Sequence, residues 1–167
     1  MIFHQAFTLN PFQENTYIIW DENGTGIIVD PGCYTYEERQ TLKNFLEEKN
    51  ITLTHILNTH AHIDHVLGVE YFRQEYKIPF YLHPKDEPLL KDAASRAQVY
   101  GFPHYQASEV DVWYEDNTGE IISGGVKLPT RDELGIVFKG TNEETDKPIF
   151  GPNKAAILGR SIIRTIT

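Results

Sequence analysis

The stretch Thr59-His-Ala-His-Ile-Asp-His65 places three histidines and an aspartate, His60, His62, Asp64 and His65, within seven consecutive residues. Alternate residues of an extended chain point to the same side. His60 and His62 are therefore expected to face one direction, whereas Asp64 and His65 enter the next turn and face another. The spacing predicts two adjacent half-sites for metal ions.

The chemistry of these side chains favours a catalytic metal over a structural one. Imidazole and carboxylate ligands suit zinc, iron or manganese. Structural zinc sites are usually built from several cysteines, but the chain has one cysteine, Cys33. A cluster of solvated loop histidines is the alternative interpretation of the same residues.

The residues on either side of the loop predict a strand before it and a helix after it. The β-branched run 51–58 is typical of a strand, and Val69, Phe72 and Tyr76 mark the inner face of a helix that ends before Pro79. In α/β sheets, ligands bind where strands end and helices begin. The predicted position of the loop is therefore that of a functional site.

The residues further upstream predict a hairpin followed by a helix. Two β-rich runs, 16–20 and 26–29, flank an Asn23-Gly24 turn, which favours antiparallel pairing. Thr35 and Glu38 then form a capping-box pattern that predicts the start of a helix. Together with the strand before the loop, this order indicates a βαβ unit with a parallel strand pair.

The second half of the chain is less regular. We expect a strand at 80–83, a helix opened by proline at 84–98, an acidic loop at 101–120 and a strand pair within 120–128. At 167 residues the chain suits one domain. The predicted organisation is an α/β domain in residues 1–128 and an irregular tail of the same domain in residues 129–167.

The composition narrows the classes of molecule that this protein is expected to bind. The net charge of −9 and the pI near 5.2 disfavour nucleic-acid binding. The first residues lack a signal-peptide pattern, no apolar run is long enough for a membrane helix, and a single cysteine excludes an intramolecular disulfide. We expect a cytoplasmic protein with no membrane or nucleic-acid partner.

With these residues in view, the chain resembles the metallo-β-lactamase superfamily, whose hallmark is HxHxDH after a strand. It is most similar to the glyoxalase II branch, the hydroxyacylglutathione hydrolase-like proteins. Supporting matches are Asn-Thr-Tyr-Ile-Ile at 15–19, Ile-Val-Asp-Pro-Gly at 28–32 and the loop with the residues before it, 57–65. The resemblance covers about residues 7–128, and the C-terminal part does not match.

The resemblance implies an αββα sandwich with a two-metal site, of which this chain holds the N-terminal half plus an irregular tail. It implies that His60 and His62 bind the first metal and Asp64 and His65 the second, with zinc expected and iron or manganese possible. The implied activity is hydrolysis of a thioester or related small acyl compound through a metal-bound hydroxide, which Asp64 would orient as the catalytic residue.

The chain departs from the family pattern after residue 128. The family draws three further ligands, two histidines and a bridging aspartate, from its second half, whereas the last histidine here is His104. Three explanations stay open: a truncation or altered reading frame, loss of catalysis, or completion of the site by another subunit. Because a half sandwich would expose an apolar sheet face, we expect a homo-oligomer.

Two rival functions stay open, one implied by the family resemblance and one by the missing downstream ligands. One is an iron-dependent persulfide dioxygenase-like oxidoreductase, and the other is a catalytically inactive metal-binding remnant. Among other polar residues, Asp30 is expected to accept hydrogen bonds behind the metal ligands. His83, His104 and Cys33 are expected to have structural roles.

Overall fold

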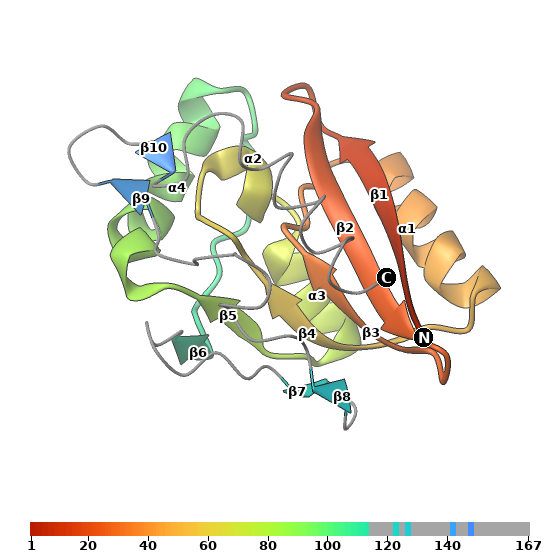
Figure 1. The fold of residues 1–167 in the computed structure, drawn as a ribbon. Coiled ribbons are helices and arrows are strands. Elements are labelled where there is room, and N and C mark those ends of the chain that lie inside the picture. Colours follow the sequence, from red (N-terminus) through yellow and green to blue (C-terminus); the bar gives the residue numbers. More distant parts are fainter. Residues whose placement is uncertain (114–121, 124–125, 128–140, 143–146, 149–167) are drawn as a thin grey trace.

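The computed structural model describes residues 1–113 and four short strands beyond them, at 122–123, 126–127, 141–142 and 147–148. Residues 1–113 form a six-stranded sheet in the order β1-β2-β3-β4-β5-β6 (Figure 1). Its strands are β1 (Ile2–Leu9), β2 (Glu14–Asp21), β3 (Thr25–Val29), β4 (Thr52–Leu57), β5 (Phe80–Leu82) and β6 (Val112–Trp113). The helical elements are α1 (Tyr36–Glu48), α2 (Ile63–Val66), α3 (Val69–Tyr76), the 3₁₀ turn η1 (Pro84–Asp86) and α4 (Glu87–Val99).

The direction of the strands decides where a site can form. β1, β2 and β3 pair antiparallel, whereas β3, β4, β5 and β6 are parallel. The hairpin and the βαβ unit predicted from the sequence are thereby confirmed. Because β3, β4 and β5 run in the same direction, the residues that follow them meet at one edge of the sheet.

The core lies between the sheet and the helices α1 and α3, which lie behind the sheet in Figure 1. One row of paired residues crosses four strands, and its members have no exposed surface: Ile18, Ile28, Ile56 and Phe80. Leu42 of α1 and Phe72 of α3 belong to the same buried cluster. This packed row holds the strand ends beside it in place.

α1 begins as the sequence predicts. The hydroxyl of Thr35 accepts the N–H of Glu38 and the carboxylate of Glu38 accepts the N–H of Thr35, so the capping box is complete. The short antiparallel pair β7 (Ile122–Ser123) and β8 (Val126–Lys127) likewise confirms the strand pair expected within 120–128.

The structure differs from the sequence expectation in four places. β1 was not predicted, because it is an edge strand whose burial does not alternate cleanly. The helix expected after the histidine loop is two helices, α2 and α3, and the helix expected at 84–98 opens with the turn η1 before α4. The acidic loop at 101–120 contains the short strand β6.

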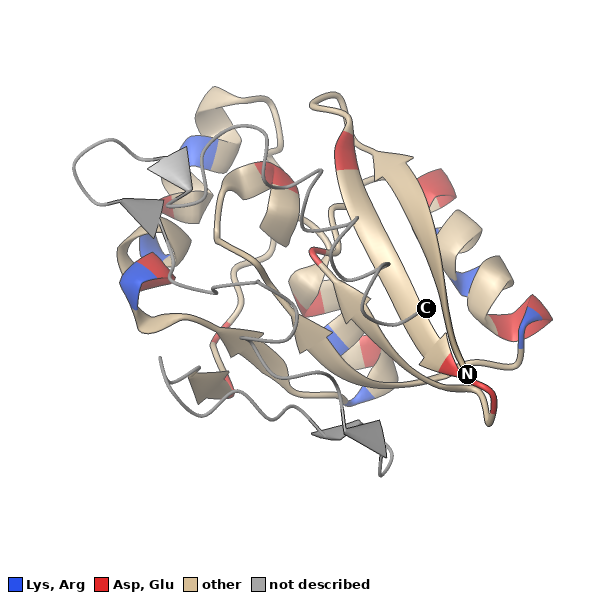
Figure 2. Ribbon diagram, viewed as in Figure 1, with Lys and Arg blue, Asp and Glu red and all other residues tan. Residues whose placement is uncertain are grey.

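The tail predicted for residues 129–167 lies outside the described residues, except for the short strands β9 (Thr141–Asn142) and β10 (Lys147–Pro148). In the described part, acidic and basic side chains are interspersed on the helices, and few lie on the strands of the large sheet (Figure 2). The helices of this part are all too short or too polar to cross a bilayer.

Candidate metal centre

The histidine loop leaves the sheet at the end of β4 and gathers its imidazoles at the edge where the parallel strands end. The ring centre of His60 lies 4.7 Å from that of His62 and 4.0 Å from that of His65. Nε2 of His65 lies 3.3 Å from Oδ2 of Asp64. All four residues predicted to bind metal are therefore close together, with His60 and His62 in the loop and Asp64 and His65 in α2.

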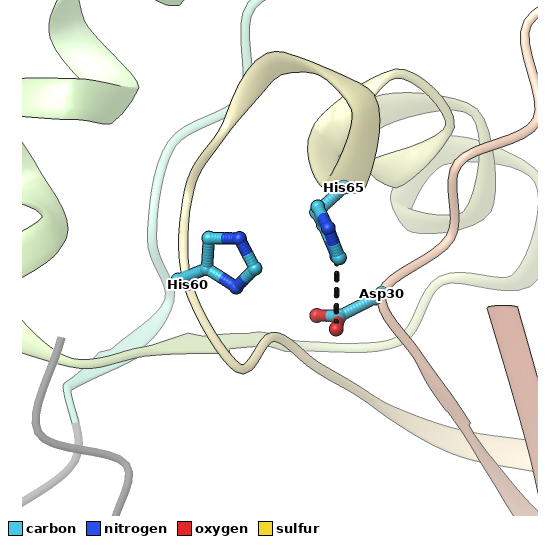
Figure 3. Close-up of side chains that lie close together, drawn as sticks. All are labelled: Asp30, His60 and His65. Carbon is cyan, nitrogen blue, oxygen red and sulfur yellow. Dashed lines mark ion pairs between the residues drawn. The ribbon is translucent and has the colours of Figure 1, made fainter. Parts of the chain in front are cut away.

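Asp30, at the end of β3, supports this loop from behind. Its Oδ1 accepts the backbone N–H of Thr59 at 2.7 Å and its Oδ2 accepts the Thr59 hydroxyl at 2.6 Å. Oδ2 also lies 3.1 Å from Nδ1 of His65. Figure 3 shows the Asp30 carboxylate and the rings of His60 and His65 pointing toward a common space. The expectation that Asp30 accepts hydrogen bonds behind the ligands is confirmed.

These contacts determine which imidazole nitrogens can bind a metal. The Thr59 hydroxyl gives its proton to Asp30, so at 2.8 Å it accepts the Nδ1–H of His60. Nδ1 of His65 faces Asp30 in the same way. In both rings Nε2 is then the nitrogen available to a metal. Histidines that bind metals usually have their other ring nitrogen engaged in this manner.

The geometry of the donor atoms fits a divalent metal. One ligand atom each from Asp30, His60 and His65 lies within 4.8 Å of the other two. Both Asp30 oxygens already accept bonds from Thr59, so we assign Asp30 to orienting the loop rather than to binding the ion. The 3.3 Å between His65 Nε2 and Asp64 Oδ2 is close to the spacing of about 3.4 Å between two ligands at about 2.1 Å from a tetrahedral ion.

The protonation states of His60 and Asp64 suit metal binding, whereas a metal bound at His65 would have to displace a proton. Burial lowers the pKa of His60 well below its usual value, and the neighbouring His65 and His62 lower it further, so His60 is neutral at physiological pH. Burial acts to raise the pKa of Asp64, but the hydrogen bond and charge of His65 outweigh it and leave the pKa lowered. For His65, burial acts to lower the pKa, but Asp30 and Asp64 raise it well above its usual value.

Several polar residues that hold the loop were missed at the sequence level. The side-chain amide of Asn10 donates to the carbonyl oxygens of Gly32 and Asp64, each at 3.0 Å, and that of Asn58 donates to the His65 carbonyl at 2.8 Å. Gly32 lies in the turn after β3. A Cβ at this position would collide with the Asp64 carbonyl at 2.6 Å, so the turn requires glycine here. Asn58 carried a usable signal, since it is polar and directly follows a buried strand.

Glu14, at the start of β2, is a further residue that the sequence did not predict, and its carboxylate is buried. Its Oε2 accepts the Thr16 hydroxyl at 2.9 Å and its Oε1 lies 3.9 Å from Nδ1 of His65. Burial raises the pKa of Glu14 to about 9. No local pattern predicts such a residue, because the contact that brings it to the histidine loop comes from His65 of α2, far away in sequence.

The other histidines and the cysteine take structural positions. Nδ1 of His83 accepts the N–H of Lys85 at the start of η1, and the exposed His104 donates its backbone N–H to the Tyr34 hydroxyl. Cys33 is fully buried, and burial raises the pKa of its thiol to about 12, which argues against a nucleophile at neutral pH.

Comparison with known proteins agrees with this architecture. The profile of the Metallo-beta-lactamase superfamily matches residues 9–143, which includes the span 7–128 expected from the sequence almost entirely and extends beyond it. The Hydroxyacylglutathione hydrolase GloC of Haemophilus influenzae is 32% identical over 119 residues, covering 71% of this chain and 54% of GloC. The chain therefore spans about half the length of this relative.

Two solved structures are similar in both sequence and fold. BLEG-1, a B3 metallo-beta-lactamase, aligns with a TM-score of 0.64 and 29% identity over 75% of this chain and 58% of its own. TTHA1623 in a di-iron-bound form aligns with a TM-score of 0.58 and 31% identity over 68% of this chain and 55% of its own. The profile match covers well over half of the chain and includes the histidine loop, so the chain belongs to the metallo-β-lactamase superfamily.

Proposed function

We propose that this chain is a metal-dependent hydrolase of the glyoxalase II type, which cleaves a thioester or a related small acyl compound. The observation that carries the proposal is the convergence of His60, His62, Asp64 and His65 at the strand ends, with Asp30 and Thr59 directing ring nitrogens toward a metal. The similarity to GloC of Haemophilus influenzae supports the choice of substrate class.

The residue roles in this proposal are those that the family resemblance implies. His60 and His62 would hold one metal and Asp64 and His65 a second, with zinc expected and iron or manganese as alternatives. When bound, such metals lower the pKa of water from 15.7 to about 7 and polarise a carbonyl group. The lowered pKa of Asp64 keeps its carboxylate ionised, so it can bind a metal and orient the attacking water.

Completion of the site is part of the proposal. A catalytic zinc normally has three protein ligands, and the first pair supplies two. The given sequence has no histidine after His104, so carboxylates of the tail and groups from another chain are candidates for the further ligands. A homo-oligomer that shares the site is one way to meet this requirement.

The test is hydrolysis of a hydroxyacylglutathione by the full chain, supplied in turn with Zn²⁺, Fe²⁺ and Mn²⁺. The site variants are His60→Ala and Asp64→Asn, and the control is His4→Ala. His4 pairs with Ile19 in the β1–β2 hairpin, away from Asn10 and the histidine loop. We expect metal-dependent hydrolysis that falls more than about 100-fold in both site variants and is unchanged in His4→Ala.

Equal background rates in all forms would contradict the hydrolase proposal and favour an inactive metal-binding remnant. Stoichiometric iron without zinc, together with oxygen consumption on a persulfide, would favour the dioxygenase-like rival. A β-lactam is assayed as a further substrate, because BLEG-1 is a metallo-beta-lactamase.

A further inference from the structure

Asp86 contacts the histidine loop at Ala61, 25 residues away in sequence. It ends the turn η1 that follows β5, and β5 pairs in parallel with β4, the strand that leads into the loop. The parallel pairing therefore brings the residues after both strands to the same edge of the sheet. Asp86 has no exposed surface, and a carboxylate is rarely buried without a specific partner.

The contact lies between the two histidines of the first pair. Oδ1 of Asp86 accepts the backbone N–H of Ala61 at 3.1 Å. Ala61 stands between His60 and His62 and is itself buried, with 1% of its surface exposed. A hydrogen bond at this N–H fixes the peptide that joins His60 to Ala61, one residue before His62.

The position of Asp86 on its own helix makes this contact informative. Asp86 precedes α4, where an aspartate usually accepts a backbone N–H of the first helical turn. Its side chain makes no such capping bond and instead turns to Ala61. The adjacent start of α4 still favours a negative charge there, and the helix is anchored in the core by Leu89, Leu90 and Ala93.

We propose that Asp86 is a positioning residue for the first metal, which sets the His60–His62 pair by accepting the Ala61 N–H. This inference rests on the metal site of the proposed function. It gives the first pair of ligands a support of its own in addition to Asp30. Asp30 faces His65 and reaches His60 through Thr59, and Asp86 holds the peptide that joins His60 to Ala61.

The experiment titrates the metal-free full chain with Co²⁺ and follows its visible absorption, with thermal unfolding measured on the same samples. Asp86→Ala removes the acceptor, and Asp86→Asn keeps an acceptor oxygen of the same shape. Asp92→Ala is the matched control, because Asp92 lies on the same helix and pairs with Arg96 at the surface.

We expect Asp86→Ala to weaken Co²⁺ binding by about 10- to 100-fold and to change the absorption bands that report ligand geometry, while Asp86→Asn and Asp92→Ala stay within about threefold of the parent chain. Equal binding by folded Asp86→Ala would overturn the inference alone. Loss of binding in a folded Asp86→Asn would also overturn it, because the charge rather than the acceptor would then matter. A parent chain that takes up no Co²⁺ would overturn the proposed function as well.

Discussion

Asp21 ends β2 and Asp30 directly follows β3, and both aspartates are buried, with 5% and 4% of their surface exposed. Oδ1 of Asp21 accepts two backbone N–H groups of the turn that follows it, at 2.9 and 2.8 Å. Asp30 instead accepts two bonds from Thr59, 29 residues away, and lies 3.1 Å from His65. The same residue type in a similar position closes a hairpin in one case and supports the metal loop in the other.

The two carboxylates differ in the sequence separation between each aspartate and its hydrogen-bond partners. The contacts of Asp21 are made within its own hairpin, so they act on the stability of that hairpin. The contacts of Asp30 join two parallel strands at the edge where the ligands gather. Substitutions should therefore separate the two aspartates by their effect on metal binding more clearly than by their effect on folding.

The largest effect is expected from Asp30→Ala. Because it leaves the Thr59 donors and His65 without their buried acceptor, we expect the free energy of unfolding to fall by about 3 to 5 kcal/mol. Metal affinity should fall by about 10- to 100-fold. Chemical denaturation and calorimetric titration with Zn²⁺ measure the two quantities. Asp21→Ala is the control, and equal metal affinity in the two variants would contradict the distinction between them.

Thr59→Val is expected to have the next largest effect. Valine keeps the shape of the side chain but removes the hydroxyl that links Asp30 to Nδ1 of His60. We expect about tenfold weaker Zn²⁺ binding and a stability loss of about 1 to 2 kcal/mol. Thr54→Val is the matched control in β4, the strand that leads to Thr59, since the Thr54 hydroxyl donates to the Gly26 carbonyl. An equal loss of Zn²⁺ affinity in Thr54→Val would refute a specific role for Thr59.

The elements of this site and the residues that gather in it were predictable because their signals are local. The capping box at Thr35, the turn at Asn23 and the HxHxDH spacing each lie within a few neighbouring residues. Asp30 was also predictable, since it stands in a turn directly after a buried strand. The order of elements was enough to place these signals at one edge of a parallel sheet.

The supports of the site were not predictable for the opposite reason. Asn10 bonds to the carbonyl of Asp64, 54 residues away, and Asp86 bonds to Ala61, 25 residues away. A single polar residue gives no periodic signal, and its partner depends on which strands pair. The strand β1 was missed because an edge strand with mixed exposure lacks clean alternation.

Asp21→Ala alone is expected to have a smaller effect than either site variant. Two hydrogen bonds of the hairpin turn are lost, and the freed backbone N–H groups of Asn23 and Thr25 lie near the surface, where water can replace the carboxylate. We expect the free energy of unfolding to fall by about 1 kcal/mol with unchanged Zn²⁺ affinity. A measurable loss of Zn²⁺ affinity would show that the hairpin is coupled to the metal loop.

The smallest effect is expected at Asp111, whose hydrogen-bond partners are distant in sequence but lie outside the metal loop. Its carboxylate accepts two bonds from Arg73 and one from the Phe80 N–H. The bonds from Arg73 lower its pKa below the usual 3.8. A depressed folded-state pKa contributes stability that is present above pH 3.8 and is lost as pH falls through the folded value.

Asp111→Asn should therefore reduce stability by about 1 kcal/mol at neutral pH, because the carboxylate of this partly exposed pair is lost. The difference between variant and parent should shrink as pH falls below about 4. Urea denaturation at several pH values measures it, and Zn²⁺ affinity should stay unchanged at neutral pH. A difference that grows toward low pH would contradict the assigned direction of the shift.

The most direct test of the central claim is the metal content of the full chain after incubation with Zn²⁺ and removal of excess ion. The account predicts at least one tightly held ion per parent chain, and none in a variant carrying both His60→Ala and His65→Ala that still folds. Equal zinc content in the two proteins, or none in the parent, would contradict the claim that the loop from Thr59 to His65 is a metal site.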